Sequence, residues 1–576
     1  MSTPKEPGDL LRESGKLTDA QLEQVRRRQQ RLKIPQHQAI VDLNFASEED
    51  TWRAVAKANN LEFIDPLALD LKRETLELVP IKLIFHYRLL PLGVEDDTLV
   101  LAFSEPPGQM EHGNLRLLLS KRFKVVLATP SGVHAVIKKN FGLGAETIQK
   151  LREERGGTEL NQEIVFDVQG KESDSALEAT VSAFVDQILQ EALRLNATDI
   201  HLEPYPNSIR LRYRLDGMLE SVPVPADMRH LHSAVVSRLK IMAGLNISEK
   251  RLPHDGRIAM KTGTEEYDLR VSIVPTRHGE AVCLRILGRQ NLFLDLSQLG
   301  MEPNQESVFG QLTQLPQGLV LLTGPTGSGK TTTLYTALAQ ANAEDRKIIT
   351  FEDPVEYQLE GTVQIQVREQ IGLTFAAGLR SVLRHDPDVV LVGEIRDHET
   401  AEIAVRAAQT GHLVLSTLHT NDSISAVTRL LEMRIEAYLI ASSLICSISQ
   451  RLARRICRHC AQEAASISKE IRQEMSESLG IPLAEVKAWQ GAGCVECNQK
   501  GHRGRVAIYE FFLLNEVIAD LIQPGLKTGE LRGAAREFGW RPLREMAWPK
   551  VQRGLIPISE QERWTHLIDP QALKGK

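Results

Sequence analysis

The sequence predicts an α/β fold for the centre of this 576-residue chain, and three observations support the prediction. First, residues 318–333 read GLVLLTGPTGSGKTTT, an apolar strand that runs into a glycine-rich loop and then into a helix start. Second, the short apolar runs IITF, VVLV and LVLST that follow are of the kind that a buried parallel sheet contains. Third, the helical stretch HETAEIAVRAAQTG separates the last two runs. This alternation is typical of a parallel sheet covered by helices.

The glycine-rich loop matches the phosphate-loop pattern G-x-x-x-x-G-K-[ST] through Gly324, Gly329, Lys330 and Thr331. Glycines let the backbone approach a phosphate chain closely, and a helix N-terminus adds favourable potential. We expect Lys330 to reach the β- and γ-phosphates of ATP and the Thr331 hydroxyl to bind Mg²⁺. The alternative is a glycine-rich turn that binds nothing. The residues expected to bind nucleotide are Gly324, Pro325, Thr326, Gly327, Ser328, Gly329, Lys330, Thr331 and Thr332.

Acidic residues flank two of the other apolar runs. Asp388 and Glu394 stand on either side of VVLV, and Glu394 is the first candidate to hold the Mg²⁺ shell or polarise the attacking water. Glu352, Asp353 and Glu356 crowd the end of IITF. Because close carboxylates repel one another, we expect a cation between these three rather than a solvated acidic turn.

Histidines bracket the run LVLST, at His412 and His419. A histidine at a strand end is most often a hydrogen-bonded surface group. Beside a phosphate-loop sheet, it is equally a candidate to face the γ-phosphate or a neighbouring subunit, and both interpretations of His419 stay open.

Two C-x-x-C pairs stand roughly thirty residues apart, at Cys457 and Cys460 and at Cys494 and Cys497. Two such knuckles complete a tetrahedral set of four thiolates, which suits structural Zn²⁺ better than redox chemistry or free thiols. We expect nearby cations to offset the negative charge of this centre: Arg454, Arg455, Arg458, Lys500, Arg503 and Arg505. The other two cysteines, Cys283 and Cys446, stand in apolar contexts typical of a core.

Composition excludes several classes of protein. The formal net charge of -6 provides no global basic surface, so we expect no nucleic-acid partner. The first residues carry neither an apolar signal core nor an arginine-rich presequence. No run of eighteen or more apolar residues is present, which predicts a chain that does not span a membrane and is cytoplasmic by default.

The chain divides into several regions by composition. Capping-box patterns at Thr18 and Ser47 predict helix starts in the first sixty residues. A polar, glycine-punctuated stretch reads as a mobile linker, and Asp216-Gly217 after an alternating strand predicts a hairpin. We expect a helical region at 1–60, a small α/β region at 61–141, a flexible linker at 142–175, an α+β domain at 176–295, the α/β core at 296–450, the four-cysteine module at 451–510 and a helical C-terminal region at 511–576.

Four boxes, in this order and at these separations, resemble the secretion ATPases of type II secretion and type IV pilus assembly: GPTGSGKTTT, TFEDPVE, DVVLVGEIRD and GHLVLSTLHTND. The resemblance covers about residues 180–550 and implies a RecA-like P-loop ATPase domain preceded by a PAS-like α+β domain. It also implies a homo-hexamer that drives a pilus or pseudopilus from the cytoplasmic face of the inner membrane. In the family, the last glutamate of the acidic box, here Glu356, positions the hydrolytic water, and Glu394 is the Walker B glutamate.

The same resemblance implies that the preceding domain supplies arginines to the nucleotide cleft, and the matching residues are Arg257 and Arg270. A cation there would stabilise the charge that develops on the transferring phosphoryl group. The alternative is two surface arginines on hairpin strands. The sequence departs from the family at His254, where glutamine is usual, which leaves Arg257 unchanged.

The family also predicts the roles of the remaining regions. Assembly and secretion members carry the four-cysteine insert and retraction motors lack it, which argues against retraction. The N-terminal region docks on inner-membrane platform and docking proteins, so we expect peripheral membrane association through partners only. Members that bind cyclic di-GMP there have an arginine where this chain has Glu6, a carboxylate that would meet a phosphate.

We therefore expect a Mg²⁺-dependent ATP hydrolase that powers pilus or pseudopilus assembly. One alternative is a nucleic-acid translocase on the same motor fold, which the acidic net charge and the 5% aromatic content disfavour. Another is a scaffold that binds nucleotide without hydrolysing it, which an intact Lys330, Glu356 and Glu394 disfavour.

Overall fold

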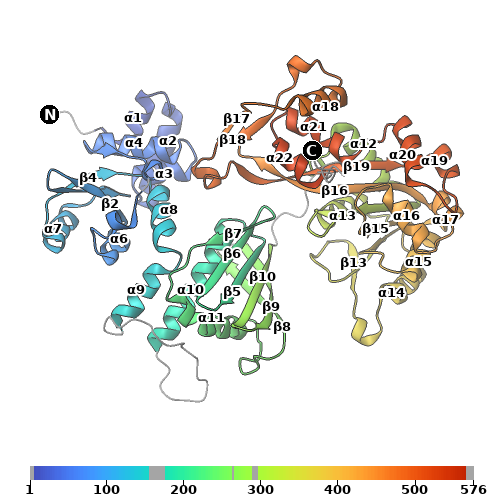
Figure 1. The fold of residues 1–576 in the computed structure, drawn as a ribbon, viewed down its shortest axis with the longest axis horizontal. Helices are drawn as coiled ribbons and strands as arrows, with labels where there is room; N and C mark the ends of the chain where they lie inside the picture. Colours follow the sequence, from blue (N-terminus) through green and yellow to red (C-terminus); the bar gives the residue numbers. More distant parts are fainter. Residues whose placement is uncertain (1–4, 70, 155–174, 263–264, 289–295, 566–576) are drawn as a thin grey trace, which may run out of the picture. The chain divides into compact units, whose positions relative to one another are not determined.

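The computed structural model describes residues 5–69, 71–154, 175–262, 265–288 and 296–565 (Figure 1). The chain forms two compact units. The first consists of Met1–Met260 with Asp268–Ile286, and the second of Lys261–Tyr267 with Leu287–Lys576.

The first unit begins with a small helical bundle, as the sequence predicts. The Thr18 side chain accepts a hydrogen bond from the Gln21 backbone N–H and the Gln21 side chain accepts one from Thr18, which confirms the predicted capping box. Ser47 caps another helix by accepting from the Asp50 backbone N–H. The helices are α1 (Pro7–Glu13), α2 (Asp19–Leu32), α3 (Gln36–Asp42) and α4 (Glu48–Ala58).

A four-stranded sheet follows, in the order β1-β4-β3-β2. Three strands are parallel to one another: β1 (Glu62–Phe63), β4 (Phe123–Leu127) and β3 (Thr98–Phe103). The fourth, β2 (Leu89–Glu95), is antiparallel to β3. Buried side chains of β3 and β4 form its core with residues of the helices. The helices of this subdomain are α5 (Arg73–Leu76), α6 (Ile81–Tyr87), α7 (Gln109–Leu119) and α8 (Pro130–Phe141).

The predicted linker differs from the structure where the structure describes it. Residues Ala145–Glu154 form a helix, α9, whose Ile148 is buried and whose Thr147 accepts a hydrogen bond from Gln187 at 3.0 Å. The Leu143 backbone N–H donates to the Pro223 carbonyl at 2.7 Å, and Gly144 lies against the ring of Phe184. This segment is therefore packed on the α+β domain. The rest of the predicted linker, from residue 155 to 174, lies outside the described residues.

The α+β domain places two helices on one face of a six-stranded sheet in the order β7-β6-β5-β10-β9-β8 (Figure 1). Tyr213 is fully buried on the helix side, where its hydroxyl donates to the Ile188 carbonyl at 2.9 Å. Asp216 and Gly217 both have positive φ between the paired strands β6 and β7, which confirms the predicted hairpin. The resemblance of this domain to a PAS domain stays a prediction. The elements are α10 (Ser175–Arg194), β5 (Asp199–Tyr205), β6 (Ser208–Leu215), β7 (Met218–Val222), α11 (Met228–Met242), β8 (His254–Thr262), β9 (Glu265–Thr276) and β10 (Gly279–Gly288).

The second unit is built on a seven-stranded sheet in the order β13-β12-β14-β15-β11-β16-β19. Every neighbouring pair is parallel except β16 with β19, and the predicted strands β11, β12, β14 and β15 are buried along their whole length. This confirms the α/β, RecA-like core. The strands are β11 (Gly318–Thr323), β12 (Ile348–Glu352), β13 (Thr362–Gln366), β14 (Val389–Val392), β15 (Leu413–Leu418), β16 (Leu444–Ile456) and β19 (His502–Leu513).

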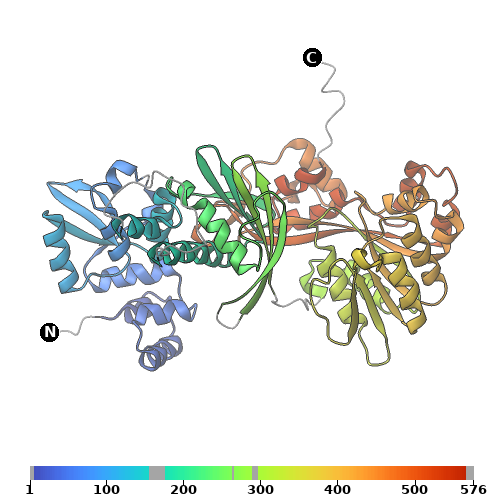
Figure 2. The same ribbon diagram turned by 90° about the horizontal axis from the view of Figure 1, so that it is seen from below.

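Helices cover both faces of this sheet, with separate apolar clusters on the two sides. The long strands β16 and β19 run side by side in both views (Figure 1, Figure 2). The helices of the core are α12 (Pro303–Thr313), α13 (Lys330–Ala341), α14 (Phe375–Val382), α15 (His398–Gln409), α16 (Ser425–Glu432) and α17 (Ala437–Ser443).

The C-terminal part of the second unit adds a two-stranded sheet and a group of helices around the buried Trp548. Glu560 on the last helix accepts hydrogen bonds from the Arg454 backbone and guanidinium, both at 2.8 Å. The elements are β17 (Ala461–Glu463), α18 (Lys469–Leu479), β18 (Trp489–Gly491), α19 (Glu516–Asp520), α20 (Thr528–Glu537), α21 (Leu543–Gln552) and α22 (Ile558–Thr565).

Candidate functional site

The parallel strands bring the predicted site residues to one edge of the sheet. β11, β12, β14 and β15 all point the same way, so the phosphate loop, the acidic box, Glu394 and His419 follow carboxyl ends at the same edge. β15 lies between β11 and β14, so the phosphate loop and Glu394 follow strands that are one strand apart in the sheet. This edge is where open α/β sheets bind ligands.

The phosphate loop adopts the backbone that its glycines predict. Gly324, Gly327 and Gly329 have φ of 141°, 78° and 90°, a region that other residues rarely adopt. Lys330 opens α13, and its ammonium group donates to the Gly324 and Pro325 carbonyls at 2.8 and 3.2 Å. Thr331 is exposed at the same helix end, where its hydroxyl is open to a cation.

Two observations mark the loop as an anion site. Burial, together with the nearby charge of Arg451, lowers the pKa of Lys330 to about 8, although Glu394 acts in the opposite direction. The buried Ser328 hydroxyl has no hydrogen-bond partner in the described residues. A phosphate chain at this loop would relieve both, because it brings negative charge and acceptor oxygens.

Glu394 and His419 are brought together beside the loop. The His419 Nε2 atom lies 3.4 Å from a Glu394 carboxylate oxygen, and Glu394 is 16% exposed. The Arg396 guanidinium donates to Glu394 and lies 3.8 Å from the Asp353 carboxylate. The hydrogen bond to Glu394 is the main cause that raises the pKa of Arg396. His419 therefore sits within the acidic cluster, and Arg396 is a member of the site that the sequence reasoning did not single out.

The predicted cation between three carboxylates of the acidic box is not supported. Glu352 is buried inside the unit, where Tyr335, Thr350 and Gln364 donate hydrogen bonds to its carboxylate. Those donors occupy both carboxylate oxygens, so Glu352 does not need a cation shared with its neighbours. Glu356 lies half-buried in the loop after β12.

The other flanking acid and the other histidine have structural partners. Asp388 stands at the opposite end of β14 and accepts the Lys347 backbone N–H at 2.6 Å. The His412 Nδ1 atom lies 3.0 Å from the Ala407 carbonyl, at the end of α15. Both residues lie at the sheet edge away from the phosphate loop.

Strand β16 contributes residues that no local motif indicates. Thr333 of α13 donates to the Gln450 side chain at 3.0 Å and lies 3.1 Å from the Tyr509 hydroxyl. A Cβ on Gly329 would lie 2.8 Å from the Gln450 side-chain nitrogen, so β16 supports the loop closely. The useful signal in the sequence is the polar pair Gln450-Arg451, which directly follows the buried run from Cys446 to Ser449.

Arg257 and Arg270 lie on β8 and β9 of the first unit and line one groove of about 530 Å³. Arg285 lines the same groove, with Cys283 and the acidic Asp255 beside it. The structure thus brings the two predicted arginines together, on a different compact unit from the phosphate loop.

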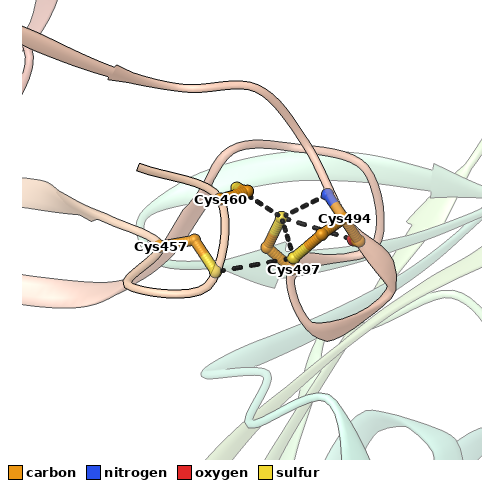
Figure 3. Close-up of side chains that lie close together, drawn as sticks. All are labelled: Cys457, Cys460, Cys494 and Cys497. Atoms are coloured by element: carbon orange, nitrogen blue, oxygen red, sulfur yellow. Dashed lines mark hydrogen bonds between the residues drawn. The ribbon is translucent and has the colours of Figure 1, made fainter. Parts of the chain in front are cut away.

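The four predicted cysteines converge on one point, with their sulfurs facing one another (Figure 3). Sγ of Cys457 lies 3.8 Å from that of Cys494, Cys460 3.8 Å from Cys497, and Cys494 3.6 Å from Cys497. A tetrahedral Zn²⁺ with bonds of about 2.3 Å requires sulfurs about 3.8 Å apart. The donor set therefore fits Zn²⁺, and it is the one such group of His, Cys, Asp or Glu among the described residues.

Backbone groups rather than arginines support this centre most directly. Burial opposes ionisation of Cys497, but the backbone N–H groups of Cys494 and Gly501, each 3.2 Å from its sulfur, help to lower its pKa to about 7. Two predicted counter-charges pair elsewhere: Arg454 with Glu560 at 2.7 Å and Arg503 with Glu496 at 2.6 Å. Both charges are therefore shared with carboxylates, and the prediction that the six cations offset the thiolates stays a prediction.

In the helical bundle, Glu6 is exposed to solvent and has a side-chain partner in Gln36. The Gln36 side chain donates to the Glu6 carboxylate at 2.6 Å and accepts the Gly8 backbone N–H at 2.6 Å. None of the described helices is long and apolar enough to cross a bilayer.

A parallel RecA-like sheet, a phosphate loop with its lysine, and an acidic residue across from it define a P-loop ATPase. The family model described as Type II/IV secretion system protein matches residues 174–563, and an MshEN domain model matches residues 59–147. The chain belongs to the Type II/IV secretion system ATPase family.

Full-length relatives come from both kinds of machine. The type IV pilus assembly ATPase PilB of Myxococcus xanthus is 37% identical over 96% of this chain and 97% of its own length. The type II secretion system protein E of Xanthomonas campestris is 38% identical over 97% of this chain and 98% of its own length. A solved structure described as the pilus retraction motor PilT with bound ADP is 26% identical over 68% of this chain and 98% of that one, with a TM-score of 0.44.

Proposed function

We propose that this protein is a hexameric motor whose ATP hydrolysis powers the assembly of a pilus or pseudopilus. The observation that carries the proposal is the meeting of Lys330, Glu394 and His419 at one edge of the RecA-like sheet. Relatives from type IV pilus assembly and from type II secretion both match almost the whole chain. In this proposal the same motor activity serves the assembly of either filament.

In this proposal each residue of the site has its own role in binding or hydrolysing ATP. Lys330 and the loop backbone bind the phosphates, and Thr331 binds Mg²⁺. Glu394 holds the Mg²⁺ shell, while Glu356 orients the attacking water. His419, 3.4 Å from Glu394, fixes that carboxylate or senses the γ-phosphate.

Arg257 and Arg270 would complete the site from the first unit. Arg396 of the phosphate-loop unit is already paired with Glu394, so Arg396 itself is not available to stabilise the developing phosphoryl charge. If those cations are on another unit, hydrolysis waits for closure, and chemistry becomes coupled to motion.

The N-terminal region and the relatives support a proposal for where the motor is attached. We propose that the helical bundle and the MshEN-like region dock on inner-membrane platform and docking proteins at the cytoplasmic face. The absence of a spanning helix among the described elements suits attachment through partners.

The test is ATP turnover by the purified hexamer. Lys330→Ala should abolish nucleotide binding, and Glu394→Gln should reduce turnover by about 10² or more while nucleotide still binds. Glu399→Gln, an exposed acid on α15, serves as the matched control and should turn over normally. Unchanged turnover in both site variants would refute the assignment.

A further inference from the structure

Arg451 lies beside the phosphate loop, although no motif includes it. It stands on β16, two residues beyond Ser449, which pairs with Thr323 at the end of the parallel ladder with β11. Since parallel strands end at the same edge, Arg451 emerges where the phosphate loop leaves β11. A Cβ on Gly324 would lie 3.0 Å from its Nη1 atom.

The guanidinium of Arg451 is half-buried and has only carbonyl partners in the described part of the chain. Nη1 donates to the Gln450 carbonyl at 3.1 Å, and Nη2 donates to the Asn421 carbonyl at 2.9 Å. The carboxylates that attract it from farther away are engaged: Glu510 accepts from Ser423 and Leu543, and Asp422 pairs with Arg532 at 2.6 Å. A half-buried cation without an ion pair is costly unless an anion joins it.

The position of Arg451 indicates which anion this is. Lys330, whose ammonium is expected at the β- and γ-phosphates, donates to the Gly324 carbonyl at 2.8 Å, and Arg451 lies against the same glycine. The two cations repel one another, and together they leave uncompensated positive charge at this end of the loop. A guanidinium retains further N–H groups beyond the two in use, in a planar fork that matches phosphate oxygens.

We propose that Arg451 is a phosphate-binding residue that contacts the γ-phosphate of ATP from the same chain as the phosphate loop. This inference rests on the proposed ATPase function. It differs from the role of Arg257 and Arg270, because Arg451 belongs to the unit that holds the loop and needs no closure of another unit. Arg451 would therefore discriminate ATP from ADP before the site is completed.

The experiment measures the affinity of the full-length protein for Mg²⁺ with a non-hydrolysable ATP analogue and, separately, with ADP. Arg451→Gln should weaken analogue binding by about tenfold or more and ADP binding by less than about threefold. The matched control is Arg406→Gln on α15, an exposed arginine with no assigned role, which should alter neither affinity. Equal weakening of both nucleotides would show a purely structural role and overturn the proposal, as would no weakening at all.

Two further measurements keep the result interpretable. If Arg451→Gln melts earlier than the wild type, Arg451→Lys keeps the charge without the fork and should still lower the ratio of ATP-analogue to ADP affinity, by about threefold. An unchanged ratio would overturn the proposal. Lys330→Ala separates the two hypotheses: normal binding there refutes the ATPase site itself, whereas lost binding with an unaffected Arg451→Gln refutes only this inference.

Discussion

At the scale of single residues, the phosphate loop concentrates positive charge that the protein itself does not neutralise. Lys330 donates to carbonyls of the loop, and Arg451 donates to carbonyls of β16 and of the segment that contains His419. The nearby carboxylate of Glu394 is paired with Arg396. Ser328 is buried without a partner. The loop is thus arranged for a polyphosphate, and the missing interactions are those a nucleotide supplies.

The lowered pKa of Lys330 predicts a pH-dependent affinity. The ammonium form binds phosphate, and because the pKa of the free site is about 8, the charge is lost as pH rises through that value. Bound phosphate restores the proton, so ADP affinity should fall about tenfold between pH 7 and pH 9. Titration calorimetry in buffers of different ionisation enthalpy should record proton uptake on binding.

The control for this prediction is Lys330→Arg, since an arginine stays charged throughout this range. Its affinity, although weaker, should be flat between pH 7 and pH 9. A flat profile in the wild type would contradict the assignment of the titrating group to Lys330.

Site residues inside contiguous motifs could be predicted from the sequence. Site residues whose role depends on the orientation of a side chain, or on a contact between distant segments, could not. Lys330 and the four cysteines follow from spacing alone. Glu352 was misinterpreted because successive strand residues face opposite sides, and its side chain turns inward to Tyr335. Arg451 was missed because its contact with Gly324 joins segments more than a hundred residues apart.

At the scale of elements, β16 links the nucleotide edge to the cysteine module. The strand pairs with β11 beside the phosphate loop, carries Arg451, and ends at Ile456 immediately before Cys457. The backbone N–H of Cys457 donates to the Gly501 carbonyl at 2.9 Å, which ties the first knuckle to the start of β19. A metal centre here would hold the ends of both long strands together.

Removal of the metal should therefore loosen the module. Cys497→Ser should lower bound zinc from about one equivalent per chain to a small fraction and reduce thermal stability, because a structural Zn²⁺ contributes folding free energy directly. Elemental analysis and differential scanning calorimetry provide the measurements. Cys283→Ser, far from the knuckles in sequence, is the control and should keep its zinc; full zinc in Cys497→Ser would contradict the site.

The ion pair between Glu560 and Arg454 should stabilise the C-terminal helix on β16. Glu560 is 1% exposed and Arg454 26%, so Glu560→Ala leaves a half-buried guanidinium without its partner. We expect a loss of about 3 kcal/mol. Urea unfolding followed by tryptophan fluorescence reports mainly on this unit, since four of the five tryptophans belong to it, Trp489, Trp540, Trp548 and Trp564, and Trp52 belongs to the first unit. A midpoint equal to that of the wild type would contradict the prediction.

The sequence was less informative about elements with weak patterns. Residues Ala145–Glu154 were assigned to a linker because charged residues dominate them, yet Ile148 and Thr147 anchor a helix on α10. That helix depends on a tertiary surface that the local sequence does not reveal. The buried strands of the second unit, by contrast, were identified correctly because continuous apolar runs need no partner to be recognised.

At the scale of the whole molecule, the proposed function uses residues of both compact units. The loop, the acids and His419 belong to the second unit, and the groove with Arg257 and Arg270 belongs to the first. If hydrolysis on one unit requires an arginine of the other, hydrolysis is coupled to the closure of the two units.

The most direct test of this central claim is steady-state ATP turnover of the hexamer carrying Arg257→Ala and Arg270→Ala together. We predict a loss of about 10³-fold or more in turnover, with nucleotide affinity within about threefold of the wild type. Arg277→Ala, on the exposed turn between β9 and β10, is the matched control and should leave turnover unchanged. Turnover of the double variant within about threefold of the wild type would contradict a site divided between the two units.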